Sequence, residues 1–153
     1  MSITKELARF ALDLQLNKVP HEAVEAAHIR VLDTLGVSLA GTPEACSRIA
    51  TEVVLESGAA GDCTQTGGMQ TTSGTQGALL NCVRAHALEF DDMTTSIVSH
   101  TSASVVPSVL ALSEQLGVTG KQFLEAYIVG FEVTTRIGWS MGFNLLKHGW
   151  HPN

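Results

Sequence analysis

The chain has 153 residues, of which 44% are hydrophobic and 16% are charged, and its formal net charge at pH 7 is −6. This composition is typical of a globular domain and excludes a disordered chain, which would bury too little apolar surface to fold. The acidic balance argues against nucleic acid or an anionic membrane as a partner, because both attract basic surfaces. A small acidic molecule can still bind where a few cations converge.

The N-terminal residues do not predict a secretory signal, because charged side chains at positions 5, 6 and 9 interrupt the apolar segment that it would need. No apolar run approaches the ~20 residues that cross a bilayer. The three cysteines, Cys46, Cys63 and Cys82, are far apart and form no CxxC pair. We therefore expect a cytoplasmic protein with three small core cysteines and neither a disulfide framework nor a zinc site.

Helical periodicity dominates the N-terminal half. A first helix is predicted over residues 2–16, and a second begins at Pro20, which suits a first turn, and continues into the small-residue run at 36–41. His28 lies on the apolar stripe of this second helix, so we expect a core or interface histidine there. A third helix is predicted from residue 42 to about Gly58.

The stretch at 58–77 is rich in Gly, Thr, Gln and Ser, and it lacks both GxxxxGK[ST] and GxGxxG. It is therefore interpreted as a structural connector rather than a phosphate-binding loop. A fourth helix is predicted over 75–90, with a buried side that contains Ala78, Leu79, Cys82 and Ala85.

A polar loop should follow at 91–101, and a fifth helix should have Pro107 in its first turn and end at Gly117. Thr119 and Gln122 form a capping-box pattern at the start of a sixth helix, which is apolar on both faces. No convincing strand is predicted. The fold class is therefore all-α, one domain of six or so helices over residues 1–153.

The C-terminal end, at 149–153, shows no cap and no closing helix. A helix that is apolar all round just before it indicates burial inside a larger fold or between subunits. We therefore expect that the fold needs more chain, and that this chain alone self-associates or is poorly soluble.

The densest group of chemically capable side chains spans a predicted helix end and the loop after it: His86, Glu89, Asp91, Asp92 and His100. His148 and His151 form a second group. Three interpretations stay open: a solvated acidic loop, a metal site, and a cofactor-free acid/base site for a carboxylated substrate. No spacing matches a named metal motif.

Five ordered segments resemble the MmgE/PrpD family, which includes 2-methylcitrate dehydratase. The segment NCVRAHALEFDD at 81–92 looks like the family's NGxxxHALDFDD helix end, and His100 stands where a family histidine follows its acidic pair. Four further segments are similar to family features: DTLGVSLAG at 33–41, VVPSVLAL at 105–112, AYIVGFEV at 126–133 and HGWHP at 148–152. The resemblance covers nearly the whole chain.

This resemblance implies a large all-α domain joined to a small α/β domain that is lacking here, usually in a homodimer. It implies lyase or isomerase chemistry on a di- or tricarboxylate without a metal or organic cofactor. Asp91 would then be an acid/base or orienting carboxylate, with Asp92 supporting it. His100 and His151 would bind substrate carboxylate or move protons.

Two alternatives accompany this expectation. One is that the chain is an inactive truncated product, or a helical module that associates through its sixth helix. The other is a metal-binding helical domain that uses the group around Asp91. Met93 and Thr94 stand where the family usually has Thr-His, which leaves the identity of the acid open.

Overall fold

The computed structural model describes residues 2–142 and 144–150. Within these residues the fold is all-helical apart from one short antiparallel hairpin, which confirms the expected fold class. The elements are α1 (Ile3–Asp13), a 3-10 turn (Leu16–Lys18), α2 (His21–Ala40), α3 (Ala45–Glu56), β1 (Cys63–Thr64), β2 (Thr71–Thr72), α4 (Gly74–His86), α5 (Thr101–Leu116), α6 (Gly120–Met141) and α7 (Asn144–Lys147).

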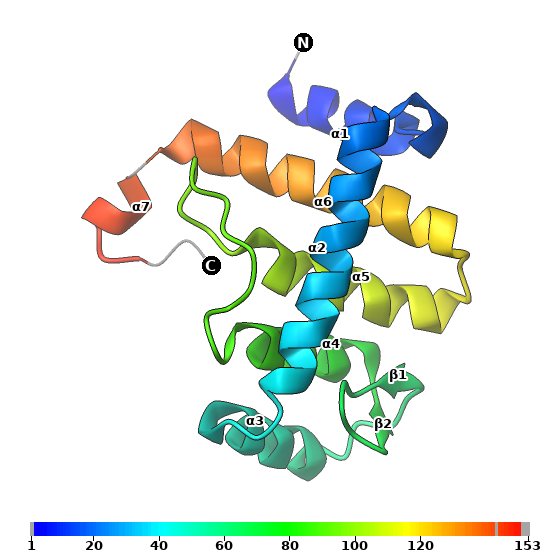
Figure 1. Ribbon diagram of the computed structural model, residues 1–153, viewed down its shortest axis with the longest axis vertical. Coiled ribbons are helices and arrows are strands. Elements are labelled where there is room, and N and C mark those ends of the chain that lie inside the picture. The colour runs from blue at the N-terminus through cyan, green and yellow to red at the C-terminus, as the bar shows by residue number, and fades with distance from the viewer. Residues whose placement is uncertain (1, 143, 151–153) are drawn as a thin grey trace.

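The long helix α2 crosses three helices that lie side by side. In Figure 1 it runs past α6, α5 and α4 in turn, and it contacts all three. The helix α3 packs on α4 at one end of this stack, and α1 lies against α6 at the other. The apolar core sits where α2, α5 and α6 meet and is centred on Ala27, Val106, Leu124 and Tyr127.

Two glycines permit unusually close helix contacts. A Cβ at Gly130 would lie 2.7 Å from Cγ1 of Val105, so α6 can approach α5 only because position 130 has no side chain. A Cβ at Gly41 would lie 2.2 Å from the carbonyl oxygen of Arg84. The end of α2 is thereby seated directly on the backbone of α4.

The predicted start of the fifth helix is wrong. Helix α5 begins at Thr101, and Pro107 lies inside it. The prediction placed Pro107 in the first turn, because proline has no backbone N–H to donate there. In the structure the carboxylate of Asp92 accepts a hydrogen bond from the Ser102 backbone N–H, which satisfies one open donor of the first turn. A contact distant in sequence thus starts the helix.

The predicted buried side of α4 is only partly correct. Ala85 is buried as predicted, but Leu79 is 53% exposed, whereas Leu80 is fully buried beside Asn81 and Arg84. The Asn81 side chain accepts from the Thr66 N–H and donates to the Thr64 carbonyl, both at 2.9 Å. Because polar residues occupy this buried face, hydrophobic periodicity misplaced it. The same contacts hold β1 against α4. The stretch at 58–77, which was expected to be a connector without strands, contains a hairpin of two-residue strands, β1 and β2.

The predictions for His28 and for the three cysteines can also be compared with the structure. The side chain of His28 is 58% exposed in this chain and lies 3.7 Å from Glu25, so the core interpretation of His28 is wrong. Cys63 is buried, Cys82 is partly buried and Cys46 is exposed, so only part of the cysteine prediction holds.

The capping box predicted for α6 is confirmed, since Thr119 and Gln122 form it. An ion pair also joins Glu132 to Arg136 on this helix at 3.0 Å. No helix among the described residues is both long and apolar enough to cross a membrane.

Candidate active site

The candidate site lies where α4 ends and α5 begins. His86 is the last residue of α4, and His100 is the N-cap of α5, so the loop at 87–99 connects two histidines at neighbouring helix ends. The loop backbone is left-handed at Glu89 (φ 52°) and at Val98 (φ 53°), conformations that non-glycine residues rarely adopt. Two sharp changes of direction thereby fold the loop back on itself and bring Asp91 to both rings.

Asp91 is the centre of the site. Its side chain is fully buried, and Nδ1 of His86 lies 3.2 Å from each of its carboxylate oxygens. Nδ1 of His100 lies 3.3 Å from Oδ2 of the same carboxylate. The two rings meet edge to face with their centroids 4.8 Å apart. The burial of Asp91 contradicts a solvated acidic loop at this position.

This arrangement suits proton transfer. An imidazole that donates its Nδ1–H to a carboxylate is fixed in the tautomer whose Nε2 carries the lone pair. When such a ring takes up a proton, the buried charge of Asp91 stabilises the imidazolium. The cluster can therefore accept a proton, return it, and present positive charge to an anionic substrate.

The neighbouring carboxylate, Asp92, has different partners. It forms an ion pair with Arg30 of α2. It also accepts hydrogen bonds from Ser102, at 3.2 Å from the backbone N–H and at 2.7 Å from the hydroxyl. The Ser102 hydroxyl lies 2.8 Å from the hydroxyl of Tyr127, and the Arg30 guanidinium lies 5.0 Å from the ring centroid of Phe131. Asp92 therefore joins the loop to three helices.

Two buried groups near the carboxylates have raised pKa values. Burial raises the pKa of Tyr127 to about 12; the Asp92 charge acts in the same direction, while the Ser102 hydrogen bond and Arg30 oppose it. Burial, followed by the charge of Asp91, raises the pKa of the Cys82 thiol. At neutral pH Tyr127 is a hydrogen-bond donor, and Cys82 is protonated rather than a nucleophilic thiolate.

The structure brings together only part of the predicted set. Asp91 and His100 meet with His86, as the sequence indicated, whereas Asp92 faces Arg30 and Glu89 is exposed. His148 is exposed after α7, and His151 lies outside the described residues.

Sequence reasoning missed Arg30 and Tyr127. A usable signal for Arg30 was its position on α2, because Ala23, Ala27 and Arg30 follow helical spacing on a face of small residues. A positively charged side chain on such a face is expected to pair with a negatively charged residue elsewhere in the fold.

Three side chains could hold a metal ion. One ligand atom from each of His86, Asp91 and His100 lies within 4.8 Å of the others. The nitrogen-to-oxygen distances are 3.2–3.3 Å. They fit direct contacts between the rings and the carboxylate, and they are also close to the separation of about 3.3–3.6 Å between two ligands of one tetrahedral Zn²⁺ bound at about 2.0–2.2 Å. The geometry therefore suits proton transfer and metal binding alike.

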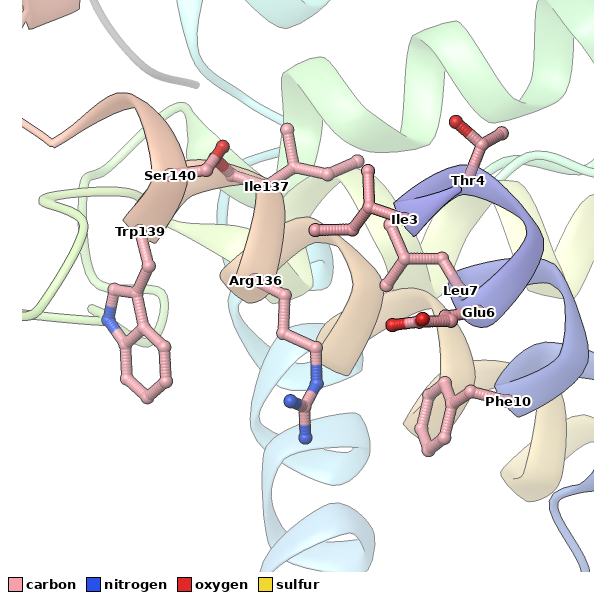
Figure 2. A pocket seen from close by; sticks show the side chains of 9 residues that line it. All are labelled: Ile3, Thr4, Glu6, Leu7, Phe10, Arg136, Ile137, Trp139 and Ser140. Atoms are coloured by element: carbon pink, nitrogen blue, oxygen red, sulfur yellow. The ribbon is translucent and has the colours of Figure 1, made fainter. Parts of the chain in front are cut away.

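A cavity lies away from this chemistry. It occupies about 640 Å³ between α1 and the C-terminal half of α6. Figure 2 shows Ile3 and Leu7 of α1 beside Ile137 of α6, with Trp139 set apart from them. The charged side chains that line it are Glu6 and Arg136. It is an apolar surface feature without an acid/base cluster.

The chain is similar to cis-aconitate decarboxylases over about a third of their length. The enzyme of Aspergillus terreus is 30% identical over 155 residues, which cover 97% of this chain and 32% of that protein. The cis-aconitate decarboxylase-like protein oryM of Aspergillus oryzae is 28% identical, with 98% and 33% covered. Mouse cis-aconitate decarboxylase is 29% identical, with 89% and 29% covered. The MmgE/PrpD N-terminal domain model matches residues 5–153, and the chain therefore belongs to the MmgE/PrpD family.

Proposed function

We propose that this chain is the acid/base-bearing N-terminal part of a lyase that acts on a di- or tricarboxylate. The observation that carries the proposal is the fully buried Asp91 carboxylate between the Nδ1 atoms of His86 and His100. Membership of the family supports the reaction class, and the curated relatives are named as cis-aconitate decarboxylases. Decarboxylation and dehydration of such an acid both need a proton moved at or near carbon next to a carboxylate.

The roles follow from the geometry. Asp91 orients both imidazoles and balances the charge of whichever ring is protonated. The ring with a free lone pair acts as the base in dehydration, and a protonated ring gives its proton to the carbanion that remains when CO₂ leaves. His100 also lies at the N-terminus of the 16-residue helix α5, whose dipole favours an anion such as a substrate carboxylate. His151 is proposed as a further carboxylate-binding group on the family resemblance alone.

The first test follows turnover of cis-aconitate and 2-methylcitrate by proton NMR. Asp91→Asn keeps the shape of the side chain but removes its charge, and we expect it to lower kcat by about 10²–10⁴-fold, the usual contribution of general acid–base catalysis. Glu89→Gln is the matched control, because Glu89 is an exposed carboxylate in the same loop and should leave kcat unchanged.

Substrate binding is followed in parallel by histidine ring NMR on the 153-residue chain. Shifts of the His86 and His100 signals on addition of either acid would support the site. Full activity in Asp91→Asn, or the absence of both turnover and ring shifts across the panel of acids, would contradict the proposal.

A metal-binding function is the second candidate, and the convergence of three ligand atoms within 4.8 Å is the observation that favours it. A site with two histidines, one carboxylate and an open position is typical of catalytic zinc. Co²⁺ added to the chain would then give visible absorption bands that Asp91→Asn abolishes and Glu89→Gln preserves. Absence of these bands would leave the acid/base function alone.

The homodimer that the resemblance implies is likewise a proposal. It is supported by large apolar side chains that remain exposed on α1, α2 and α6, among them Leu12, Leu32 and Trp139. Association through these surfaces would fit either an enzyme subunit or a helical module without activity.

A further inference from the structure

We propose that a hydrogen-bonded network on one side of the site loop positions Asp91 between the two histidines. This network, called the Asp92 network below, consists of Asp92, Arg30, Ser102 and Tyr127. Its part in catalysis rests on the proposed function, whereas its effect on the geometry of Asp91 can be measured without turnover.

The first step is the restraint on Asp92 itself. One carboxylate oxygen accepts from the Ser102 backbone N–H at 3.2 Å, and the other accepts from the Ser102 hydroxyl at 2.7 Å and pairs with Arg30. The Asp92 side chain is only 11% exposed. A carboxylate held at both oxygens by partners from two helices cannot rotate without breaking charge-assisted hydrogen bonds.

The second step is that the partners are themselves fixed. Tyr127 of α6 is 1% exposed and meets the Ser102 hydroxyl at 2.8 Å. Arg30 of α2 stacks over the ring of Phe131 at 5.0 Å. The restraint on Asp92 therefore reaches the junction of α2, α5 and α6, where the apolar core is packed.

The third step joins this restraint to the site. Asp91 contacts His100, and the next residue, Asp92, contacts Ser102, so the same two segments are linked twice in succession. If the second link loosens, the loop can shift along the start of α5 and carry the Asp91 carboxylate away from the rings. A displacement of about 1 Å in a catalytic group can cost on the order of 10²-fold in rate.

Helix capping is the simpler account of the same contacts, and it predicts different observations. If Asp92 only capped α5, breaking the network would lower Tm but would leave the His86–Asp91 hydrogen bond and the His100–Asp91 contact intact in the folded protein. A positioning role predicts that these contacts change well below Tm. The ring Nδ1–H signals of ¹⁵N-labelled histidines report them directly.

Ser102→Ala is the main variant, because it removes the hydroxyl that joins Asp92 to Tyr127 and retains the backbone N–H. We expect it to weaken or abolish the Nδ1–H signal of His86, which is hydrogen-bonded to Asp91, and to shift the ring signals of His100 in the folded chain. Ser104→Ala is the matched control. Ser104 lies two residues after Ser102 on the same helix, and its hydroxyl donates to the Thr101 carbonyl. This substitution should leave both signals unchanged.

Arg30 supplies a second and independent test. Arg30→Met should reproduce the loss of the ring signals, whereas Arg30→Lys keeps the positive charge and should restore much of them. If Ser102→Ala fails to fold, Tyr127→Phe takes its place, because it removes a single hydroxyl from the other end of the network. Circular dichroism on each sample establishes that the helices are intact.

The kinetic arm uses the same variants. In a protein with turnover, Ser102→Ala and Arg30→Met should lower kcat by about 10- to 100-fold, with a much smaller change in KM. Ring signals that change in the variants, in a protein that shows neither turnover nor ring shifts on addition of the acids, would support positioning and refute the proposed function. Unchanged ring signals in folded Ser102→Ala and Arg30→Met, with only Tm lowered, would overturn positioning and leave helix capping.

Discussion

The centre of this molecule and its α1–α6 edge are built in opposite ways. Among the described residues, buried polar or charged side chains are as numerous as buried apolar ones, and half of the polar ones lie on α4, α5 and the loop between them. At the edge, Ile3, Leu12, Ile137 and Trp139 are exposed. The centre is therefore specified by directional hydrogen bonds, whereas the edge carries the apolar surface that normally drives packing.

This contrast shows that the buried polar side chains and the candidate acid/base groups lie in the same part of the chain. Asn81, which fixes the connector, belongs to α4, and Asp92, which fixes the site loop, is hydrogen-bonded to the first turn of α5. The cavity between α1 and α6 has volume and apolar walls but no convergent acid/base groups.

The largest expected effect concerns Leu80, a large apolar side chain that is buried among the polar residues of the centre. Leu80→Ala removes a fully buried side chain, so the free energy of unfolding should fall by about 2–5 kcal/mol. Its neighbour Leu79 is 53% exposed, and Leu79→Ala should change the free energy of unfolding by less than about 0.5 kcal/mol. Urea denaturation of both variants measures this difference. Equal losses would show that the buried face of α4 is wrongly placed.

The second effect concerns the ionisation of Tyr127, which is the single tyrosine of the chain. Burial raises its pKa to about 12, so tyrosinate absorbance should rise near that pH instead of near the ordinary value of about 10. The stability that this group contributes is complete below about pH 10 and is lost as pH rises towards 12. Tyr127→Phe should lack this alkaline loss. A midpoint near 10 in a sample that is still helical would refute the burial of the hydroxyl.

The third effect tests the edge. If the exposed apolar side chains support association, the wild-type chain should self-associate in sedimentation velocity, and a double variant, Ile137→Glu with Trp139→Glu, should do so more weakly. Burying one large apolar side chain contributes about 1.5–3 kcal/mol, so a weakening of at least about tenfold in Kd is expected. Met69→Glu is the control, since Met69 is fully exposed on the connector. A monomeric wild-type chain at all concentrations would contradict the prediction.

The smallest effect also lies at the edge. Glu132 and Arg136 pair at 3.0 Å on α6, but their side chains are 42% and 53% exposed. Glu132→Gln should therefore lower the free energy of unfolding by only about 0.3–0.5 kcal/mol, and added salt should reduce the difference. Thermal unfolding at two salt concentrations measures it. A loss above about 1 kcal/mol would mean that the pair contributes to packing at the edge.

The fold class and most helices could be predicted because they depend on local periodicity and caps. The capping box of Thr119 and Gln122 is an example, since its donors and acceptors lie within one turn. The start of α5 could not be predicted in this way, because the group that caps it, Asp92, lies ten residues earlier. The buried face of α4 was misplaced because Asn81 and Arg84 are buried through polar contacts that hydropathy does not register.

The candidate site was predicted in its chemistry but not in its division of roles. The cluster of His86, Asp91 and His100 was visible in the sequence as a dense group at a helix end. Consecutive carboxylates look equivalent in sequence, and only the tertiary partners separate Asp91, which faces the rings, from Asp92, which faces Arg30. Arg30 lies 62 residues from Asp92, beyond the reach of any local pattern.

The two left-handed residues that bracket the site loop have a consequence for partial unfolding. Glu89 and Val98 hold backbone conformations that cost on the order of 1–3 kcal/mol each, and such conformations persist only while surrounding contacts enforce them. Segments of this kind open locally at lower free energy than the packed helices. We expect amide hydrogens in the loop at 87–99 to exchange sooner than those of α4 and α5 when the protein is warmed. A sample with its full helical signal can therefore already have lost its site.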